Sequence, residues 1–160
     1  MIRRALVFLA CAAGCATVRP LPADHVLVVS APPRYRDVAI RAAAYLNEDI
    51  GCRAVRVADL DADISIITSD DMPALAAATW SPHERLVRLR PWLNSTELFV
   101  SLAHEFGHAL GLDHDLPGPS STLMAPSLMV SNAVEYDLPR LPRLTDEDAA
   151  QLRKWMCHGG

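Results

Sequence analysis

The segment 104–114 constrains this chain more than any other feature, because it holds three histidines at fixed spacings. It reads His-Glu-Phe-Gly-His-Ala-Leu-Gly-Leu-Asp-His. On a helix, His104 and His108 lie about one turn apart on the same face, so both imidazoles can reach one point. A continuous helix would rotate His114 by about 240° from His108 and point it away. The three rings can therefore meet only if the chain turns before His114.

Gly111 permits this turn, because glycine reaches positive φ at little cost and commonly follows a helix end. With the turn made, His114 joins His104 and His108 as the third ligand of one metal ion. Three neutral imidazoles leave the fourth position of a tetrahedral zinc ion for water, which is typical of catalytic sites. Glu105, beside these ligands, is the expected general base. The segment therefore predicts one catalytic zinc ion and a hydrolytic reaction.

A methionine ten residues after His114 adds a second motif. Met124 lies in the segment 121–126, which reads Ser-Thr-Leu-Met-Ala-Pro. Together with the histidine segment, it resembles the zinc motif and Met-turn of the metzincin metallopeptidases, and among them the matrixins. The resemblance covers about residues 25–157. It implies that Met124 forms an apolar floor beneath the zinc, with Met129 as a weaker candidate for that position.

The same resemblance implies a fold and an activity. The expected fold is α+β and zincin-like (metzincin): a twisted, mixed, mostly parallel five-stranded sheet with three helices and a small C-terminal subdomain. The expected activity is that of a zinc-dependent endopeptidase, with a protein or peptide substrate along the edge strand of the sheet. The segment 125–136 would form the wall of the pocket next to the scissile bond. Matrixins usually carry a structural zinc ion and calcium in the loop corresponding to 72–80, which is short here and has no histidine. One zinc ion is therefore expected.

Two alternatives to an endopeptidase remain at this point. A non-catalytic zinc-binding envelope protein could use the same site to dock a partner peptide, although the presence of Glu105 argues against it. Zinc hydrolysis could also act on a non-protein amide, such as cell-wall material.

Hydrophobic periodicity predicts the order of the elements. Strands are expected at 25–30, 53–57, 63–67, 75–80 and 85–90, and a helix from about residue 35 to 50. Asn94 and Glu97 have the spacing of a capping box for the helix that carries the histidines. Thr145 and Asp148 have the same relation at the start of a C-terminal helix, which we expect to pack under the histidine helix. The residues expected on buried helix faces are Val38, Ala42, Tyr45, Leu46, Leu98, Leu102, Phe106 and Ala109.

The N-terminal segment has the composition of an export signal. Two arginines precede an apolar run that is too short to span a membrane as a mature helix. Residues 1–15 are therefore predicted to be a signal peptide, 16–24 a tether, and 25–160 the metallopeptidase domain. Ala-Ala-Gly-Cys at 12–15 resembles a lipobox that would place a lipid on Cys15. The alternative is cleavage after Ala16 and secretion.

The cysteines indicate the compartment of the protein, and its net charge indicates which partners it can bind. Export would leave Cys52 and Cys157 as a pair in an oxidising compartment, either as a disulfide or as two buried thiols. A net charge of −4 without a basic cluster argues against nucleic-acid binding. We expect a monomer that contacts a membrane only through a lipid on Cys15. His25 is expected at the surface, and the aspartates between 61 and 71 in solvated turns rather than at a calcium site.

Overall fold

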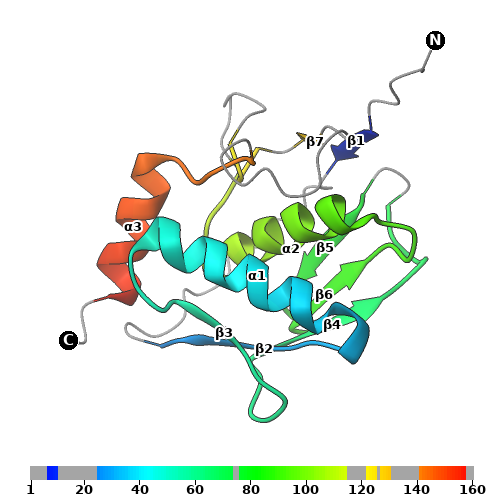
Figure 1. The fold of residues 1–160 in the computed structure, drawn as a ribbon, viewed down its shortest axis with the longest axis horizontal. Helices are drawn as coiled ribbons and strands as arrows, with labels where there is room; N and C mark the ends of the chain where they lie inside the picture. The colour runs from blue at the N-terminus through cyan, green and yellow to red at the C-terminus, as the bar shows by residue number, and fades with distance from the viewer. Residues whose placement is uncertain are drawn as a thin grey trace.

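A computed structural model describes residues 7–10, 25–73, 76–114, 122–125, 127–130 and 141–157. Its main sheet has five strands in the order β3 (Val55–Val57), β2 (Leu27–Ser30), β4 (Ile64–Thr68), β6 (Leu86–Leu89) and β5 (Ala78–Ser81). Two long helices, α1 (Pro33–Ile50) and α2 (Ser95–Ala109), lie side by side across one face (Figure 1). A shorter helix, α3, lies at one end of α1. This arrangement confirms the predicted metzincin-type fold.

The sheet is mixed and mostly parallel, as predicted. The first of its strands, β2 (Leu27–Ser30), pairs in parallel with both β3 (Val55–Val57) and β4 (Ile64–Thr68). On the other side of β4, β6 (Leu86–Leu89) is also parallel, whereas β5 (Ala78–Ser81) runs antiparallel to β6 and ends the sheet. The predicted edge strand is therefore confirmed, although it begins three residues later than expected.

Helix α1 (Pro33–Ile50) begins two residues before the predicted start. Proline is favoured in the first turn of a helix, where its missing N–H would have no intrahelical partner. The helix ends at Gly51, whose φ of 85° is in the left-handed region. After this turn, the Asn47 side chain accepts hydrogen bonds from the backbone N–H groups of Ala54 and Val55. β3 begins there, at Val55 rather than at residue 53. The predicted inner face is buried at Val38, Ala42, Tyr45 and Leu46.

Helix α2 (Ser95–Ala109) begins with the predicted capping box. The Asn94 side chain accepts hydrogen bonds from the N–H groups of Thr96 and Glu97, and the Glu97 carboxylate accepts one from the Asn94 N–H at 3.0 Å. The helix lies between α1 and the β5 end of the sheet, so its central turns are enclosed by protein on several sides. The predicted inner residues Leu98, Leu102, Phe106 and Ala109 are buried.

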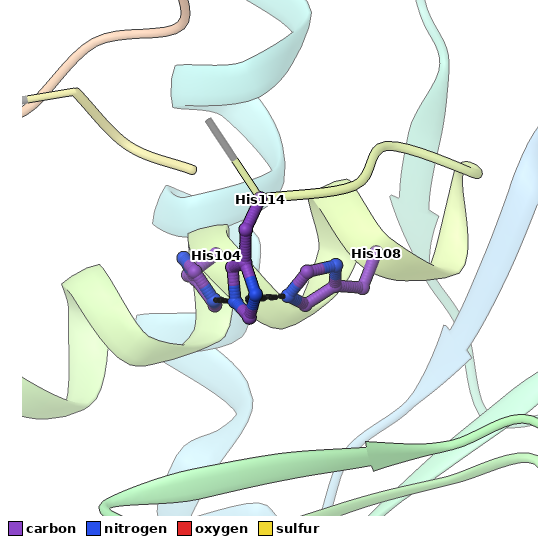
Figure 2. Close-up of side chains that lie close together, drawn as sticks. All are labelled: His104, His108 and His114. Atoms are coloured by element: carbon purple, nitrogen blue, oxygen red, sulfur yellow. Dashed lines mark hydrogen bonds between the residues drawn. The ribbon is translucent and has the colours of Figure 1, made fainter. Parts of the chain in front are cut away.

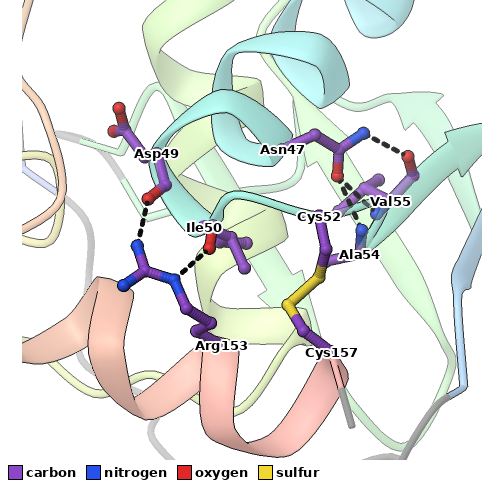
Figure 3. The surroundings of a disulfide bond; sticks show 8 residues. All are labelled: Asn47, Asp49, Ile50, Cys52, Ala54, Val55, Arg153 and Cys157. Atoms are coloured by element: carbon purple, nitrogen blue, oxygen red, sulfur yellow. Dashed lines mark hydrogen bonds between the residues drawn. A yellow bond between two sulfur atoms is a disulfide. The ribbon is translucent and has the colours of Figure 1, made fainter. Parts of the chain in front are cut away.

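Helix α3 (Asp146–Met156) is capped by Thr145, whose hydroxyl accepts a hydrogen bond from the Asp148 N–H, as predicted. The prediction that this helix packs under α2 was wrong, because its main partner is α1. Arg153 explains this placement, since its guanidinium donates a hydrogen bond of 2.8 Å to the Ile50 carbonyl at the end of α1 (Figure 3).

A disulfide between Cys52 and Cys157 joins the loop after α1 to the end of α3 (Figure 3). The two Cα atoms are 6.0 Å apart, within the usual range for a disulfide. Of the two states that the sequence left open for this pair, the structure therefore shows the bonded one.

Asp63 differs from its predicted solvated role. Its carboxylate accepts hydrogen bonds from the Val28 N–H at 2.8 Å and from His25 Nε2 at 2.9 Å. It therefore ties the start of β4 to β2, and His25 is a partner of Asp63 rather than a member of the histidine cluster described below.

A second, two-stranded sheet lies apart from the main one. In it β1 (Val7–Ala10) pairs antiparallel with β7 (Ser127–Val130). The first strand falls within the predicted signal peptide and the second within the predicted pocket wall, whereas 16–24, 126 and 131–136 are outside the described residues. The signal, tether and domain boundaries therefore stay predictions. Within the described segments, no helix has both the length and the apolar character needed to cross a membrane.

Candidate metal centre

The chain turns back immediately after α2. Gly111 has a φ of 97°, its N–H donates a hydrogen bond to the His108 carbonyl, and the Leu112 N–H donates one to the Gly107 carbonyl, both at 3.0 Å. This pair of hydrogen bonds is the Schellman motif, which satisfies the last carbonyls of a helix and reverses the chain. His114 is thereby returned to the side of α2 that carries the other two histidines, as the sequence predicted (Figure 2).

The three imidazoles converge through their Nε2 atoms. The Nε2–Nε2 distances are 3.0 Å between His104 and His108, 3.1 Å between His108 and His114, and 3.3 Å between His104 and His114 (Figure 2). Zinc–nitrogen bonds of about 2.0–2.1 Å in a tetrahedral site place the nitrogens about 3.3–3.4 Å apart. The geometry therefore fits three ligands of a single zinc ion.

Hydrogen bonds on the opposite side of two rings determine which nitrogen carries the proton. His104 Nδ1 is 2.6 Å from the Leu123 carbonyl oxygen, and His108 Nδ1 is 2.8 Å from that of Leu112. A carbonyl only accepts, so each Nδ1 must be the donor and each neutral ring has a lone pair on Nε2. Two lone pairs facing each other at 3.0 Å repel unless a cation lies between them. The close contact is therefore that of a metal-ligand set rather than a hydrogen bond.

Burial keeps these rings neutral. It lowers the pKa of His104 to about 3, with a further lowering from the neighbouring His108 ring. Burial also lowers the pKa of His108 from its ordinary value. Both rings are consequently unprotonated near pH 7, which is the form that binds a metal.

Glu105 lies next to the first ligand on α2, and its side chain is buried, with 1% of the residue exposed. Among the described residues, the group of converging ligand atoms consists of His104, His108 and His114 and does not include the Glu105 carboxylate. Glu105 is thus a buried acidic residue next in sequence to the first metal ligand, and it is not a member of the ligand group.

The family model of the matrixins, described as Peptidase_M10, matches residues 45–153. The chain belongs to the matrixin family. The cofactor of its three-histidine site is zinc.

Individual proteins match this matrixin either over a short segment or at low sequence identity. The human protein "Disintegrin and metalloproteinase domain-containing protein 15" is 48% identical over 61 residues, which are 37% of this chain and 7% of the human protein. The crystal structure of myroilysin has the same fold, with a TM-score of 0.52 and 13% identity over 86% of this chain and 85% of that one. A zinc-dependent peptidase from Methanocorpusculum labreanum matches at a TM-score of 0.47 and 11% identity, over 78% of this chain and 98% of that one.

Met124 of this matrixin lies against the zinc-binding helix. It is fully buried, and its Sδ would be 2.5 Å from a Cβ atom placed on Gly107, so only a glycine leaves it room. The preceding residue, Leu123, supplies the carbonyl that accepts the hydrogen bond from His104. Met124 therefore has the buried, apolar environment predicted for it, whereas Met129 lies in β7.

Two backbone carbonyls that orient the ligands, those of Leu112 and Leu123, were not among the predicted site groups. Every residue has a carbonyl, so a carbonyl partner leaves no mark in residue identity. The Leu112 carbonyl could have been inferred from the glycine turn, because that turn brings the segment after α2 back over His108.

Replacing Gly111 with alanine tests the role of the turn in this matrixin. A left-handed backbone costs a residue with a Cβ about 1–2 kcal/mol, so we expect the free energy of unfolding to fall by that amount. Because His114 lies three residues after Gly111, zinc affinity should also fall, by roughly tenfold if about 1.4 kcal/mol of this strain opposes binding. Chemical denaturation and chelator competition measure the two effects.

Gly51→Ala is the matched control. Gly51 has a φ of 85° and ends α1, away from the histidines. This variant should lose similar stability and bind zinc as the wild type does. Equal zinc affinities in the Gly51→Ala and Gly111→Ala proteins would show that the turn at Gly111 does not position His114.

Proposed function

We propose that this matrixin is a zinc-dependent endopeptidase that uses Glu105 as its general base. One observation carries the proposal: the Nε2 atoms of three imidazoles converge within 3.3 Å of each other, and the residue after the first of them is a buried glutamate outside their group. A ligand set of three leaves a tetrahedral ion one position for water or substrate.

Each residue then has a defined part in peptide hydrolysis. When bound, zinc supplies a Lewis acid for the substrate carbonyl and lowers the pKa of a water molecule. His104 and His108 keep their lone pairs directed at the ion, because their Nδ1 protons are donated to backbone carbonyls. Glu105 accepts a proton from the attacking water and delivers it to the leaving amine nitrogen, so the water is divided between the two products.

The position of β5 at the edge of the main sheet favours a peptide as the substrate. β5 is the last strand, with β6 as its neighbour on one side, and it contacts α2, which carries two of the zinc ligands. Backbone groups on the outer edge of such a strand can pair with an extended peptide. We therefore expect the substrate to be an extended polypeptide segment aligned along β5.

The test is zinc-dependent cleavage of a library of internally quenched peptides by the purified protein. We expect cleavage within peptide chains, its loss when a chelator removes the metal, and its return when zinc is added. Cleavage that persists after complete removal of zinc would contradict the proposal. Stoichiometric zinc with peptide binding and no cleavage would instead indicate the non-catalytic docking protein.

We also propose that the chain is exported and carries a lipid on Cys15. The Cys52–Cys157 disulfide supports export, because such bonds are typical of oxidising compartments. The mass of the mature N-terminal peptide distinguishes a lipid-modified Cys15 from an unmodified chain cleaved after Ala16.

A further inference from the structure

The carbonyl that orients His104 is itself held by a distant part of the chain. The Leu123 N–H donates a hydrogen bond of 2.8 Å to the Arg143 carbonyl, and among the described residues these two segments are joined by an isolated parallel bridge between Thr122 and Arg143. An isolated bridge lacks the repeated hydrogen bonds of a strand pair. The position of Leu123 therefore depends on what holds the Arg143 backbone in place.

The Arg143 side chain attaches that backbone to the end of α1. Its Nη1 lies 2.5 Å from Asp49 Oδ1 and 3.7 Å from a Glu48 oxygen, and its guanidinium lies 4.1 Å from the centre of the Tyr45 ring. The other Asp49 oxygen accepts a hydrogen bond of 3.2 Å from the Leu144 N–H. The Asp49 side chain is 11% exposed and the Arg143 side chain 37% exposed, so the pair is partly shielded from water on the Asp49 side.

Tyr45 adds a second attachment between the same segments. Its hydroxyl lies 3.2 Å from the Leu141 carbonyl oxygen and 3.1 Å from that of Pro142, so its proton is shared between two acceptors. Burial raises the pKa of Tyr45 to about 12, which keeps the hydroxyl protonated and able to donate. Residues 141–144 are thus fastened to α1 immediately before α3 begins.

We propose that Asp49 and Arg143 are positioning residues for the zinc site. Their ion pair sets the Arg143 backbone, the Arg143 carbonyl sets Leu123, and the Leu123 carbonyl holds the His104 ring with its Nε2 lone pair on the metal. This proposal rests on the proposed function only in that His104 binds zinc. Changes to the groups behind metal ligands typically weaken metal binding by about 10- to 100-fold.

Arg153 provides a matched control within the same structure. Like Arg143, it is an arginine that fastens the C-terminal segment to the end of α1, through hydrogen bonds to the Ile50 carbonyl at 2.8 Å and the Asp49 carbonyl at 3.4 Å (Figure 3). Arg153, however, belongs to α3, whereas the carbonyl that accepts the hydrogen bond from the Leu123 N–H belongs to Arg143. Losing Arg153 should therefore loosen the C-terminal segment without moving the carbonyl that orients His104.

The experiment measures zinc dissociation constants of the full chain by chelator competition, with thermal unfolding of the zinc-free protein in parallel. Arg143→Ala should raise the zinc Kd by about 10- to 100-fold. Asp49→Asn should raise it in the same direction, and the double variant should bind about as weakly as Arg143→Ala alone, because both changes remove one interaction. Arg153→Ala should lower the melting temperature with the zinc Kd unchanged.

The cobalt-loaded proteins give a second readout that a merely structural role would not move. The visible spectrum of Co²⁺ reports the geometry of its ligands, so it should change in Arg143→Ala and match the wild type in Arg153→Ala. Arg143→Lys keeps a positive charge beside Asp49 and should recover part of the lost affinity.

An Arg143→Ala protein that is less stable but binds zinc as tightly as the wild type would overturn the proposal. If that variant does not fold, a wild-type zinc Kd in the conservative Asp49→Asn protein would overturn it equally. Weak zinc binding by Arg143→Ala in a protein whose wild type cleaves no peptide would support the positioning roles and refute the proposed function. If the wild type binds no zinc, both the positioning roles and the proposed function are refuted.

Discussion

Replacing Glu105 with glutamine should lower kcat/KM for peptide cleavage by about 10²- to 10⁴-fold, the usual contribution of general acid–base catalysis. Glutamine has nearly the shape of glutamate but does not accept a proton at neutral pH. The side chain is buried and lies outside the group of zinc ligands, so the metal site should remain intact. Steady-state kinetics and metal analysis of the same sample measure the loss of activity and the retained zinc.

Glu97→Gln is the matched control, because Glu97 is a second buried glutamate on α2. Its carboxylate caps the start of the helix rather than facing the metal site. We expect this variant to stay close to wild type in stability, because a glutamine at this position can still accept the hydrogen bond from the Asn94 N–H, and to keep wild-type activity per folded molecule. Undiminished cleavage by Glu105→Gln would remove Glu105 from the mechanism, whereas loss of zinc from that variant would assign it a part in holding the metal.

Replacing both Cys52 and Cys157 with alanine should lower the free energy of unfolding by about 4–5 kcal/mol in the chain-entropy model of disulfides. The size of the effect follows from the sequence separation of 105 residues, because a long closed loop removes much conformational freedom from the unfolded chain. Urea denaturation of the oxidised wild type and of the double variant measures the difference.

The double variant also controls for the reducing agent. Reduction of the wild type should shift its urea midpoint to that of the Cys52→Ala/Cys157→Ala protein, and the same reagent should leave the variant unchanged. Coincident midpoints for the oxidised wild type and the variant would show that the bond contributes nothing to the stability of the domain.

The zinc ligands and the turn that gathers them were predictable because the physics that places them is local. The four-residue spacing of His104 and His108 places both on one helix face, and Gly111 provides the positive φ that returns His114. The start of α2 was predictable for the same reason, since Asn94 and Glu97 are three residues apart and cap each other. Each of these features depends on a few consecutive residues and on hydrogen bonds within one turn.

The boundaries of the strands were less predictable, because hydrophobic alternation does not show where the hydrogen-bonded ladder stops. β3 begins at Val55, where the Asn47 side chain accepts hydrogen bonds from the N–H groups of Ala54 and Val55. Asp63 was expected in solvent, yet it receives hydrogen bonds from His25 and Val28, more than thirty residues away. Its role depends on which strands become neighbours in the sheet.

The amino-acid sequence by itself determined the metal ligands, the adjacent carboxylate, the helix caps and the edge strand, since local spacing and backbone preference specify them. Only the tertiary structure decided that Cys52 and Cys157 are bonded, that α3 packs on α1, and that the Leu123 and Arg143 carbonyls connect His104 to Asp49. These contacts join residues far apart in sequence, and several use backbone carbonyls that all residues share. Spacing and composition therefore do not encode them, and they arise only when the packed elements bring those groups within hydrogen-bonding distance.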